Sequence, residues 1–517
     1  MSRFSRFAQS LASGYVLLGA NVLYTLASVP LALSYLGKAE FGLWALTTSI
    51  AGYIGFLDFG LSASASRILI DYKDARSESN YGSVIQTGAL VGLTQGTLVF
   101  IVGAALAFVV GPWLKIPPEL KRDFIWLMIG QCGLLGFSFA ARILTHILTA
   151  HQRYDIPNYA SSVLFAVNYG VLWYCFARGL GVFSILWAQG IGTVLVTAIN
   201  GVACFRLKLL PEAGKWGRPA WDKFKELFVF GRDFFFCAVG NQMINASQTI
   251  LLTRLLGLEV AAEWSICTRT YTMLQQVIFR IFDYSSSALA EMIVRQERLL
   301  LLQRFRQIAT VSCSISIAAA LMFAVSNGVF VRVWTNRSLD WPVINDVLLA
   351  VWLILSASMR VHTGLAGQTK RFAFLRFIYF LEGAAFVLFA LLLHARGGIT
   401  GMLLISIGCT LAFSFPYGLY RTKSYFDLSW TQLLEWHRSA FTFLVWVIPV
   451  GAIVWLLTRE LSFPIRLGIN TALVGAWTFW ALFRHGLGKP LQFEMMARAP
   501  GWARPVLLWA GLRGPSK

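Results

Sequence analysis

The chain of 517 residues is 57% hydrophobic and only 13% charged, with a mean hydropathy of +0.64. Soluble domains carry about 25% charged residues, so this composition excludes a soluble globular protein and favours one that crosses a membrane many times. A formal charge of +20 would suit nucleic acid. In a membrane protein, however, basic residues first indicate topology, and we expect no nucleic-acid partner.

The apolar segments predict an all-α polytopic membrane protein with fourteen transmembrane helices. A span needs about 20 predominantly apolar residues. Fourteen such stretches are centred near residues 24, 54, 97, 137, 168, 191, 242, 275, 318, 355, 383, 408, 448 and 474. The first, from Leu11 to Leu36, is too long for the apolar region of a signal peptide, so we expect it to remain as a helix. The seven cysteines lie in apolar segments without a CxxC pair, which indicates packing and no metal site.

The stretch from Tyr35 to Arg67 begins with a short turn and continues as a long apolar helix. Its counterpart lies 220 residues later, where Leu256-Gly257 matches Leu36-Gly37 and Trp264 matches Trp44. A second match, at an offset of 216, places Gln152 on Gln368 at the ends of helices 4 and 10, which read Ala150-His151-Gln152-Arg153 and Gly367-Gln368-Thr369-Lys370. The chain therefore contains an internal repeat.

The repeat predicts two parallel six-helix lobes, because an even number of spans separates corresponding helices. Parallel repeats are a transporter architecture with the substrate site between the halves. We expect an N-terminal lobe at 1–205, a basic cytoplasmic connection at 206–225, a C-terminal lobe at 226–420, helices 13 and 14 at 421–484, and a basic cytoplasmic tail at 485–517.

The distribution of basic residues predicts the orientation. If the N-terminus is cytoplasmic and fourteen spans alternate, most of the 44 lysines and arginines lie on the cytoplasmic side, and both termini are cytoplasmic. The densest cluster is the connection between helices 6 and 7, where lysines and arginines alternate with Trp216 and Trp221. That composition suits a segment at the lipid headgroups. The outward connections are short and leave no room for a catalytic domain outside the membrane.

Helix 8 carries the most informative polar stripe. Its members recur every three or four residues and share one face of a helix: Ser265, Arg269, Thr272, Gln276, Arg280, Asp283 and Ser287. An arginine at membrane depth costs at least about 2.5 kcal/mol, so it usually faces a cavity or a partner. Arg269, Gln276 and Arg280 are therefore candidate substrate-binding residues. Alternatively, Arg280 pairs with Asp283 one turn on or extends to the headgroups.

Helices 1 and 7 carry a second, repeat-related polar stripe. Asn21, Thr25 and Ser28 on helix 1 match Asn241, Asn245 and Gln248 on helix 7. Amides and hydroxyls both donate and accept hydrogen bonds, which suits sugar hydroxyls, so Asn21, Thr25, Asn241, Asn245 and Gln248 are candidate substrate contacts. Hydrogen bonding between neighbouring helices is the alternative interpretation.

Asp58 is the only acid in the predicted spans of the first lobe. A buried carboxylate could carry a coupling ion, and Asp58 and Asp283 are the candidates for that role. Asp58 could equally pair with Arg142 of helix 4. The sequence has no Walker motif, no GxSxG and no metal-ligand signature, so we expect no enzyme activity and no cofactor.

Three segments resemble a known family: LGKAEFGLWALTTSIAGYIGFLDFGL, LLGLEVAAEWSICTRTY and ILTAHQRYDIPNY. They are similar to the Wzx-type oligosaccharide flippases of the multidrug/oligosaccharidyl-lipid/polysaccharide (MOP) exporter superfamily. The resemblance implies a cavity lined largely by helices 1, 2, 7 and 8. It departs from two relatives, because helix 1 has neither the acid common in multidrug exporters nor the arginine expected of lipid II flippases.

The resemblance implies a transporter in the cell inner membrane that flips a polyprenyl-diphosphate-linked oligosaccharide to the outer leaflet by alternating access, for surface polysaccharide assembly. Membrane lipid and other polysaccharide-assembly proteins are the further partners that we expect. The alternatives are a multidrug exporter of the same superfamily and an integral-membrane polysaccharide polymerase or ligase. The identity of the sugar, the coupling ion and the oligomeric state are not encoded in any motif of the chain.

Overall fold

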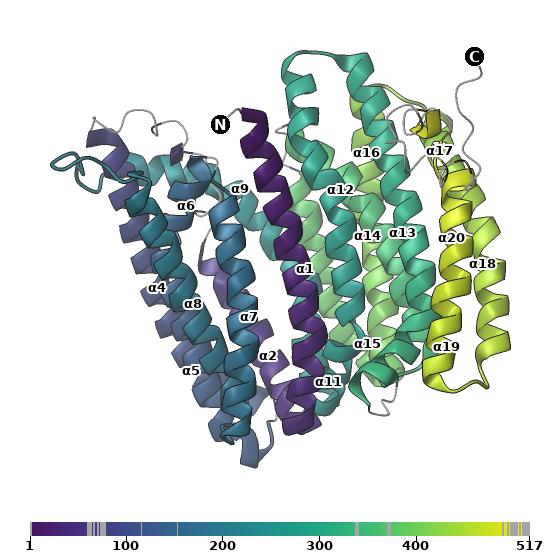
Figure 1. The fold of residues 1–517 in the computed structure, drawn as a ribbon, viewed down its shortest axis with the longest axis horizontal. Helices are drawn as coiled ribbons and strands as arrows, with labels where there is room; N and C mark the ends of the chain where they lie inside the picture. Colours follow the sequence, from purple (N-terminus) through teal and green to yellow (C-terminus); the bar gives the residue numbers. More distant parts are fainter. Residues whose placement is uncertain are drawn as a thin grey trace. The chain divides into compact units, whose positions relative to one another are not determined.

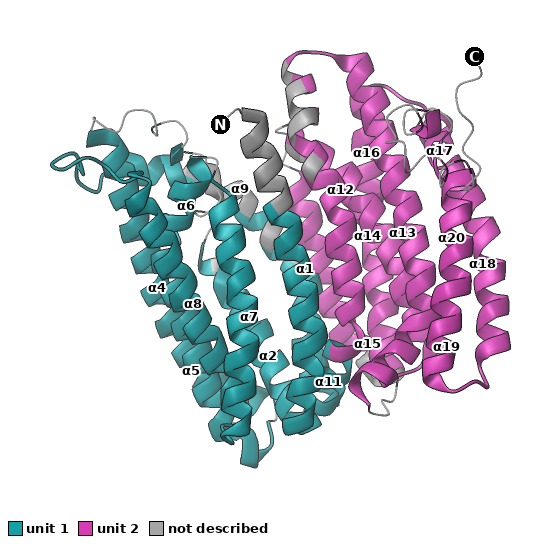
Figure 2. Cartoon of the chain, in the orientation of Figure 1, with its two compact units in different colours: residues 1–265 teal, residues 266–517 magenta. Residues whose placement is uncertain are grey.

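The described part of the chain is helical in this computed structural model (Figure 1). The structure describes residues 3–58, 61, 65, 68–69, 72, 79–114, 116–151, 153–336, 341–369, 374–488, 491–493, 496, 505 and 508. The predicted all-α class is confirmed, and the described residues contain no strand. Two compact units, residues 1–265 and 266–517, are distinguished by their internal packing (Figure 2). The predicted six-helix lobes and their boundaries stay a prediction.

Unit 1 contains the elements up to most of α11. They are α1 (Arg3–Tyr35), α2 (Lys38–Ile54), η1 (Gly55–Asp58), α4 (Ser79–Trp113), α5 (Pro118–Ala141), α6 (Ile143–Ala150), α7 (Asp155–Ala177), α8 (Phe183–Arg206), α9 (Trp221–Asn245), α10 (Ser247–Leu256) and α11 (Leu258–Cys267). Helix α4 packs along α5, and α7 packs between α1 and α8. A Cβ added to Gly96 of α4 would lie 2.3 Å from the carbonyl oxygen of Gly136 on α5. Glycines thus permit close helix packing here, as is usual within membranes.

Unit 2 contains the remaining helices. They are α12 (Arg269–Val294), α13 (Arg298–Thr335), α14 (Val343–Gln368), α15 (Leu375–Ala412), α16 (Ser414–Phe426), α17 (Trp430–Trp436), α18 (Arg438–Thr458), α19 (Phe463–Ile469), η2 (Asn470–Val474), α20 (Gly475–Ala481) and η3 (Leu482–Gly486). Helix α13 packs against α12, α14 and α18. Gly398 divides α15, because its φ of 51° and ψ of −139° are not helical and suit only a residue without Cβ.

Ten of the described helices are long and apolar enough to cross a membrane. They are 13–35, 79–113, 118–150, 155–177, 183–206, 298–335, 343–366, 375–393, 397–426 and 438–458. The predicted count of fourteen is therefore not confirmed. The stretches predicted near residues 54, 242, 275 and 474 are helical but do not qualify as spans. The first, α2, has only 17 residues, and the second, α9, ends at Asn245. The third, α12, contains two arginines, and the fourth is interrupted by the π-helical turns η2 and η3 beside α20.

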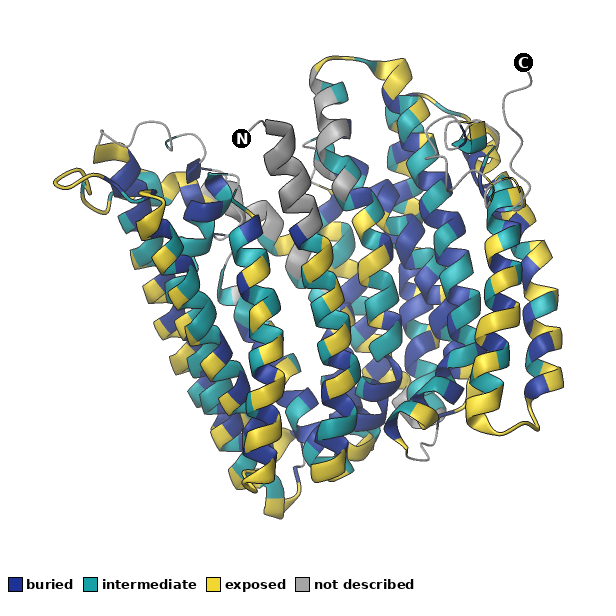
Figure 3. Cartoon of the chain, in the orientation of Figure 1, coloured by how far each residue is buried: buried dark blue, intermediate teal, exposed yellow. Residues whose placement is uncertain are grey.

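Exposed residues recur along the helices of both units (Figure 3), and many of them are large and apolar. Leu23 on α1 and Val445 on α18 are each 70% exposed, and Phe205 on α8 is 76% exposed. A soluble protein rarely exposes such side chains in contiguous patches. Lipid is the solvent in which these surfaces are stable, so the chain is a multi-pass membrane protein. Six of the cysteines are buried and unpaired, as expected of packing residues, and the side chain of Cys237 lies outside the described residues.

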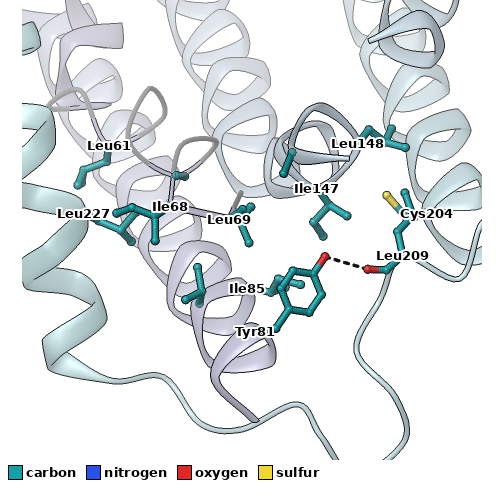
Figure 4. Close-up of a cluster of buried hydrophobic side chains, with 13 residues drawn as sticks. Leu61, Ile68, Leu69, Tyr81, Ile85, Ile147, Leu148, Cys204, Leu209 and Leu227 are labelled. Carbon is teal, nitrogen blue, oxygen red and sulfur yellow. Dashed lines mark hydrogen bonds between the residues drawn. The ribbon is translucent and has the colours of Figure 1, made fainter. Parts of the chain in front are cut away.

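The basic connection after α8 packs onto the beginning of α4. Tyr81, which is fully buried in an apolar cluster, donates a hydrogen bond of 2.9 Å from its hydroxyl to the carbonyl oxygen of Leu209 (Figure 4). Nearby, Ser83 donates to the carbonyl oxygen of Arg218 at 2.6 Å. A Cβ on Gly82 would lie 2.4 Å from the carbonyl oxygen of Lys215, so a larger residue would separate the two segments. The connection is thereby fixed in position although it is not helical before Trp221.

The start of α2 and the start of α11, which are related by the internal repeat, contact each other. A Cβ on Gly42 would lie 2.1 Å from the carbonyl oxygen of Leu258 and 3.4 Å from the Cβ of Ala262. Beside this contact, Lys38 and Glu263 form an ion pair of 3.1 Å. Contact between a residue and its own repeat mate is what a local two-fold axis produces, and it supports the offset of 220 residues.

Candidate functional site

Helix α12 is divided into a buried apolar face and an exposed polar face. Tyr271, Ile278, Phe282 and Leu289 are buried against unit 2. The residues of the predicted stripe lie on the other face: Thr272, Gln276 and Arg280 are exposed, and Arg269 and Asp283 are half-buried. The three- and four-residue spacing places them on one side of the helix. Ser265 lies on the preceding helix α11, and the side chain of Ser287 lies outside the described residues.

The carboxylate of Asp283 pairs with a neighbouring helix. Its partner is Arg360 of α14, at 2.6 Å, and the guanidinium of Arg360 also lies 5.7 Å from the ring centre of Phe279. Pairing between Arg280 and Asp283 was the alternative that helix periodicity suggested. In the structure the carboxylate bridges α12 to α14 instead.

Among the described residues of the polar face of α12 and its partner on α14, arginines outnumber acids. Arg269, Arg280 and Arg360 supply three guanidiniums, whereas Asp283 supplies one carboxylate. Arg269 and Arg280 are eleven residues apart, or about 16 Å along the helix axis. A guanidinium binds phosphate or carboxylate oxygens through two parallel hydrogen bonds. The face is therefore suited to an anionic ligand that extends along the helix axis.

The repeat-related polar residues of helices 1 and 7 differ in exposure. On α1, Asn21 is half-buried and Thr25 is buried. On α9 and α10, Asn245 is exposed and Gln248 is buried. The side chain of Asn241 lies outside the described residues. Their role as substrate contacts stays a prediction, and burial of Thr25 and Gln248 is also compatible with the alternative of hydrogen bonding between helices.

Asp58 lies at the end of η1 and pairs with Arg142, which separates α5 from α6. The two groups are 2.8 Å apart, and each side chain is 21% exposed. Gln95 of α4 donates to the carbonyl oxygens of Leu57 and Asp58 at 3.0 and 2.7 Å and accepts from Arg142 at 3.1 Å. The pairing predicted as an alternative for Asp58 is thus present, and ion coupling through Asp58 stays a prediction.

An apolar cavity of about 650 Å³ lies within unit 2, and sequence reasoning missed it. Helices α13, α14, α16, α17 and α18 line it, with Ile317, Leu321, Ile354 and Leu444 among its walls. A cavity of this size with almost entirely apolar walls suits a hydrocarbon chain. The signal in the sequence was the apolar spacing of Ala440, Leu444 and Val447 on α18, but a local pattern does not show which helices meet across a gap.

Comparisons with known proteins concern the family and the fold. The family model described as polysaccharide biosynthesis protein matches residues 11–286, which is more than half of the chain. No curated protein sequence matches this chain.

Among solved structures, an inward-facing multidrug resistance MATE family transporter of the MOP superfamily is similar over 80% of this chain and 98% of its own, at 13% identity and a TM-score of 0.64. The lipid II flippase MurJ, in an inward closed conformation, is similar over 92% of this chain and 98% of its own, at 11% identity and a TM-score of 0.64. A MOP superfamily transporter from Pyrococcus furiosus is similar over 82% and 96%, at 15% identity and a TM-score of 0.58. These similarities show that the fold is that of the MOP superfamily.

Proposed function

Because the chain belongs to the polysaccharide biosynthesis protein family, we propose that it flips a polyprenyl-diphosphate-linked oligosaccharide from the cytoplasmic to the outer leaflet by alternating access. The observation that carries this proposal is the polar face of α12, which presents Arg269, Gln276 and Arg280, in a helix whose other face packs into a membrane-spanning unit. Exposure of arginine at membrane depth is costly unless a polar ligand or water occupies that face. A flippase for a charged lipid requires such a face.

The diphosphate is the part of the substrate that Arg269 and Arg280 would hold. Both guanidiniums lie on the polar face, and the carboxylate of Asp283 beside them pairs with Arg360 of α14. Charge-assisted hydrogen bonds to phosphate oxygens are about twice as strong as neutral ones. The number of charge-assisted hydrogen bonds to the substrate must stay small, because a transporter that binds its substrate too tightly in one state does not release it in the next.

The sugar would be held by neutral groups. Gln276 is exposed on α12 between the two arginines, and Asn245 is exposed at the end of α9. Amides provide both donors and acceptors and therefore match hydroxyls of either role. Asn21, Thr25, Asn241 and Gln248 are proposed as further contacts, to be made as the helices move during transport.

The polyprenyl chain would remain in an apolar environment throughout. The apolar cavity of unit 2 has the volume and lining for part of such a chain. Transferring hydrocarbon into it from lipid costs little, because both environments are apolar. A multidrug exporter would use the same fold, but an apolar cavity in the same unit as a cationic face favours an amphipathic, anionic substrate.

The remaining features of the proposal concern orientation. We propose fourteen spans in two six-helix lobes with two additional C-terminal helices, both termini in the cytoplasm, and a location in the cell inner membrane. The basic connection fixed against α4 supports this orientation, because clustered basic residues beside short loops favour the cytoplasmic side.

The proposal is tested by the location of the lipid-linked sugar in a deletion strain. Completed lipid-linked oligosaccharide should accumulate in the cytoplasmic leaflet, protected from an impermeant glycosidase added to spheroplasts, and surface glycan should be absent. Complementation with the parent gene should restore access. If the sugar is freely accessible in the deletion strain but unpolymerised, the protein is a polymerase or ligase and the flippase proposal fails. An unchanged sugar pool with increased drug sensitivity would indicate a multidrug exporter.

A further inference from the structure

A second cavity, of about 570 Å³, lies at the end of unit 2 where α13 and α18 begin. It is separate from the polar face of α12 and from the apolar cavity, to which the proposed function assigns the substrate. Its lining differs from that of the apolar cavity, because most of the residues that line it are of polar types, among them Gln303, Arg306, Arg438, Ser439 and Thr442. Trp436 and Leu491 add apolar surface. The two cavities use different faces of α18, since Ala440, Leu444 and Val447 line the apolar one.

The position of the polar cavity along α13 corresponds to lipid headgroup depth. Helix α13 has 38 residues and is therefore about 57 Å long, whereas the hydrocarbon core is about 30 Å thick. The first nine residues of the helix include Arg298, Arg304 and Arg306, which are costly in hydrocarbon and favourable at the interface. The predicted topology assigns this end of α13 to the cytoplasmic side.

Several side chains of the cavity have unused hydrogen-bonding capacity. Within the part of the chain that the structure describes, neither the guanidinium of Arg306 nor that of Arg438 has a hydrogen-bond or ion-pair partner. Both side chains are exposed into the same hollow. Ser439 and Gln303 are likewise without a side-chain partner among the described residues. Five guanidinium donors on each arginine can therefore be offered to a ligand.

The walls of the cavity are fixed independently of these residues. Thr310 of α13 donates to the carbonyl oxygen of Trp436 at 3.1 Å, which holds the α17–α18 corner against α13. Thr442 donates to the carbonyl oxygen of Arg438 at 2.9 Å, which leaves its oxygen free to accept. A preformed cavity with unsatisfied donors is the arrangement that binds an anion with little ordering cost.

We propose that this cavity binds the headgroup of an anionic phospholipid. Among the described residues, two guanidiniums and the carboxylate of Glu435 line it, so their sum is one positive charge, which suits one phosphodiester. Basic pockets between transmembrane helices on the cytoplasmic side bind such headgroups. Trp436 and Leu491 offer an apolar surface for the glycerol and the first methylenes. A polyprenyl diphosphate carries more charge, and its chain would have to leave the apolar cavity on the other face of α18.

The test uses the purified full-length protein in detergent and native mass spectrometry with phosphatidylglycerol or phosphatidylcholine. The parent protein should retain phosphatidylglycerol preferentially, and the R306Q/R438Q variant should bind it about tenfold more weakly, as expected for the loss of about 1.4 kcal/mol. R306K/R438K should be intermediate, because lysine keeps the charge without the planar fork. R459Q is the matched control, since Arg459 is exposed at the other end of α18 and pairs with Glu460 at 3.0 Å.

Elution volume and melting temperature establish that each variant is folded. Equal retention of the two lipids by the parent, or retention of phosphatidylglycerol by a folded R306Q/R438Q variant at the parent level, would overturn the proposal. Polyprenyl phosphate is the third ligand. If its binding, and not that of phosphatidylglycerol, is lost in the double variant, the cavity serves the transported substrate and the proposed phospholipid site is wrong.

Discussion

Gly42 and Ala262 are repeat mates, 220 residues apart, and they pack against each other where α2 approaches α11. The backbone of Leu258 lies so close to Gly42 that no Cβ fits between them. In the predicted topology this contact is at the outer ends of helices 2 and 8. If transport proceeds by alternating access, we expect these helix ends to separate when the substrate path opens outward.

The first prediction concerns this close approach. Ala in place of Gly inside a helix normally stabilises it by about 0.5–1 kcal/mol. At position 42 the new Cβ would lie 2.1 Å from a carbonyl oxygen, so Gly42→Ala should instead destabilise the protein by about 1–3 kcal/mol, as overpacking does. Gly19→Ala on α1 is the control, because nothing lies within 4 Å of its Cβ position. Thermal unfolding in detergent measures both, and an equal rise in melting temperature for the two variants would contradict the packing described.

The repeat and the polar face of α12 were predictable from the sequence because each depends on local spacing. Trp44 and Trp264 recur at a fixed offset, and Gln276 and Arg280 recur at helical intervals. The partner of Asp283 was not predictable, because periodicity favours its neighbour Arg280, whereas tertiary packing brings Arg360 of α14 to it. The apolar cavity was missed for the same reason, since the helices that line it include α13 and α18, which are far apart in the chain.

The number of spans shows a different limit. A hydropathy pattern counts apolar stretches. It separated the two parts of α15, which Gly398 divides, but it did not show that Asn470 begins a π-helical turn after α19. Three of the four stretches that do not qualify as spans lie at α2, α9 and α12, which correspond to helices 2, 7 and 8; the resemblance assigns these helices to the cavity together with helix 1, which does qualify. A polar path requires polar or interrupted helices, so the hydropathy signal is weakest where function is expected.

The second prediction concerns Arg269 and Arg280. Either Arg→Ala change should reduce flipping at least about tenfold, because a charge-assisted hydrogen bond to phosphate contributes about 1.5–3 kcal/mol. Lysine at either position should restore part of the activity, since it keeps charge but not bidentate geometry. Surface glycan per cell, at matched protein level, is the readout, with Arg459→Ala as the control. Normal glycan in a folded Arg269→Ala variant would remove Arg269 from the site.

The third prediction separates the two interpretations of Asp58. If the carboxylate serves mainly to pair with Arg142, Asp58→Asn and Arg142→Gln should each destabilise the protein by about 1–3 kcal/mol, because each leaves a partly buried charge without its partner. The double variant should then be less destabilised than the sum of the two and should still transport. Ion coupling through Asp58 predicts instead that the double variant is folded but loses the dependence of transport on an imposed ion gradient.

The last prediction concerns orientation, and it uses two exposed lysines in unit 1. Lys121 lies in the first turn of α5, and Lys215 lies in the basic connection whose backbone packs against Gly82. The excess of basic residues in such connections predicts that Lys215 is cytoplasmic and Lys121 is outside. A membrane-impermeant maleimide should therefore label Lys121→Cys in intact cells and label Lys215→Cys only after the membrane is permeabilised.

The parent protein is a suitable background, because its six described cysteines are buried, and its own labelling corrects for Cys237. Labelling of Lys215→Cys in intact cells with protection of Lys121→Cys would reverse the topology, and it would place the polar cavity at the beginning of α13 in the outer leaflet.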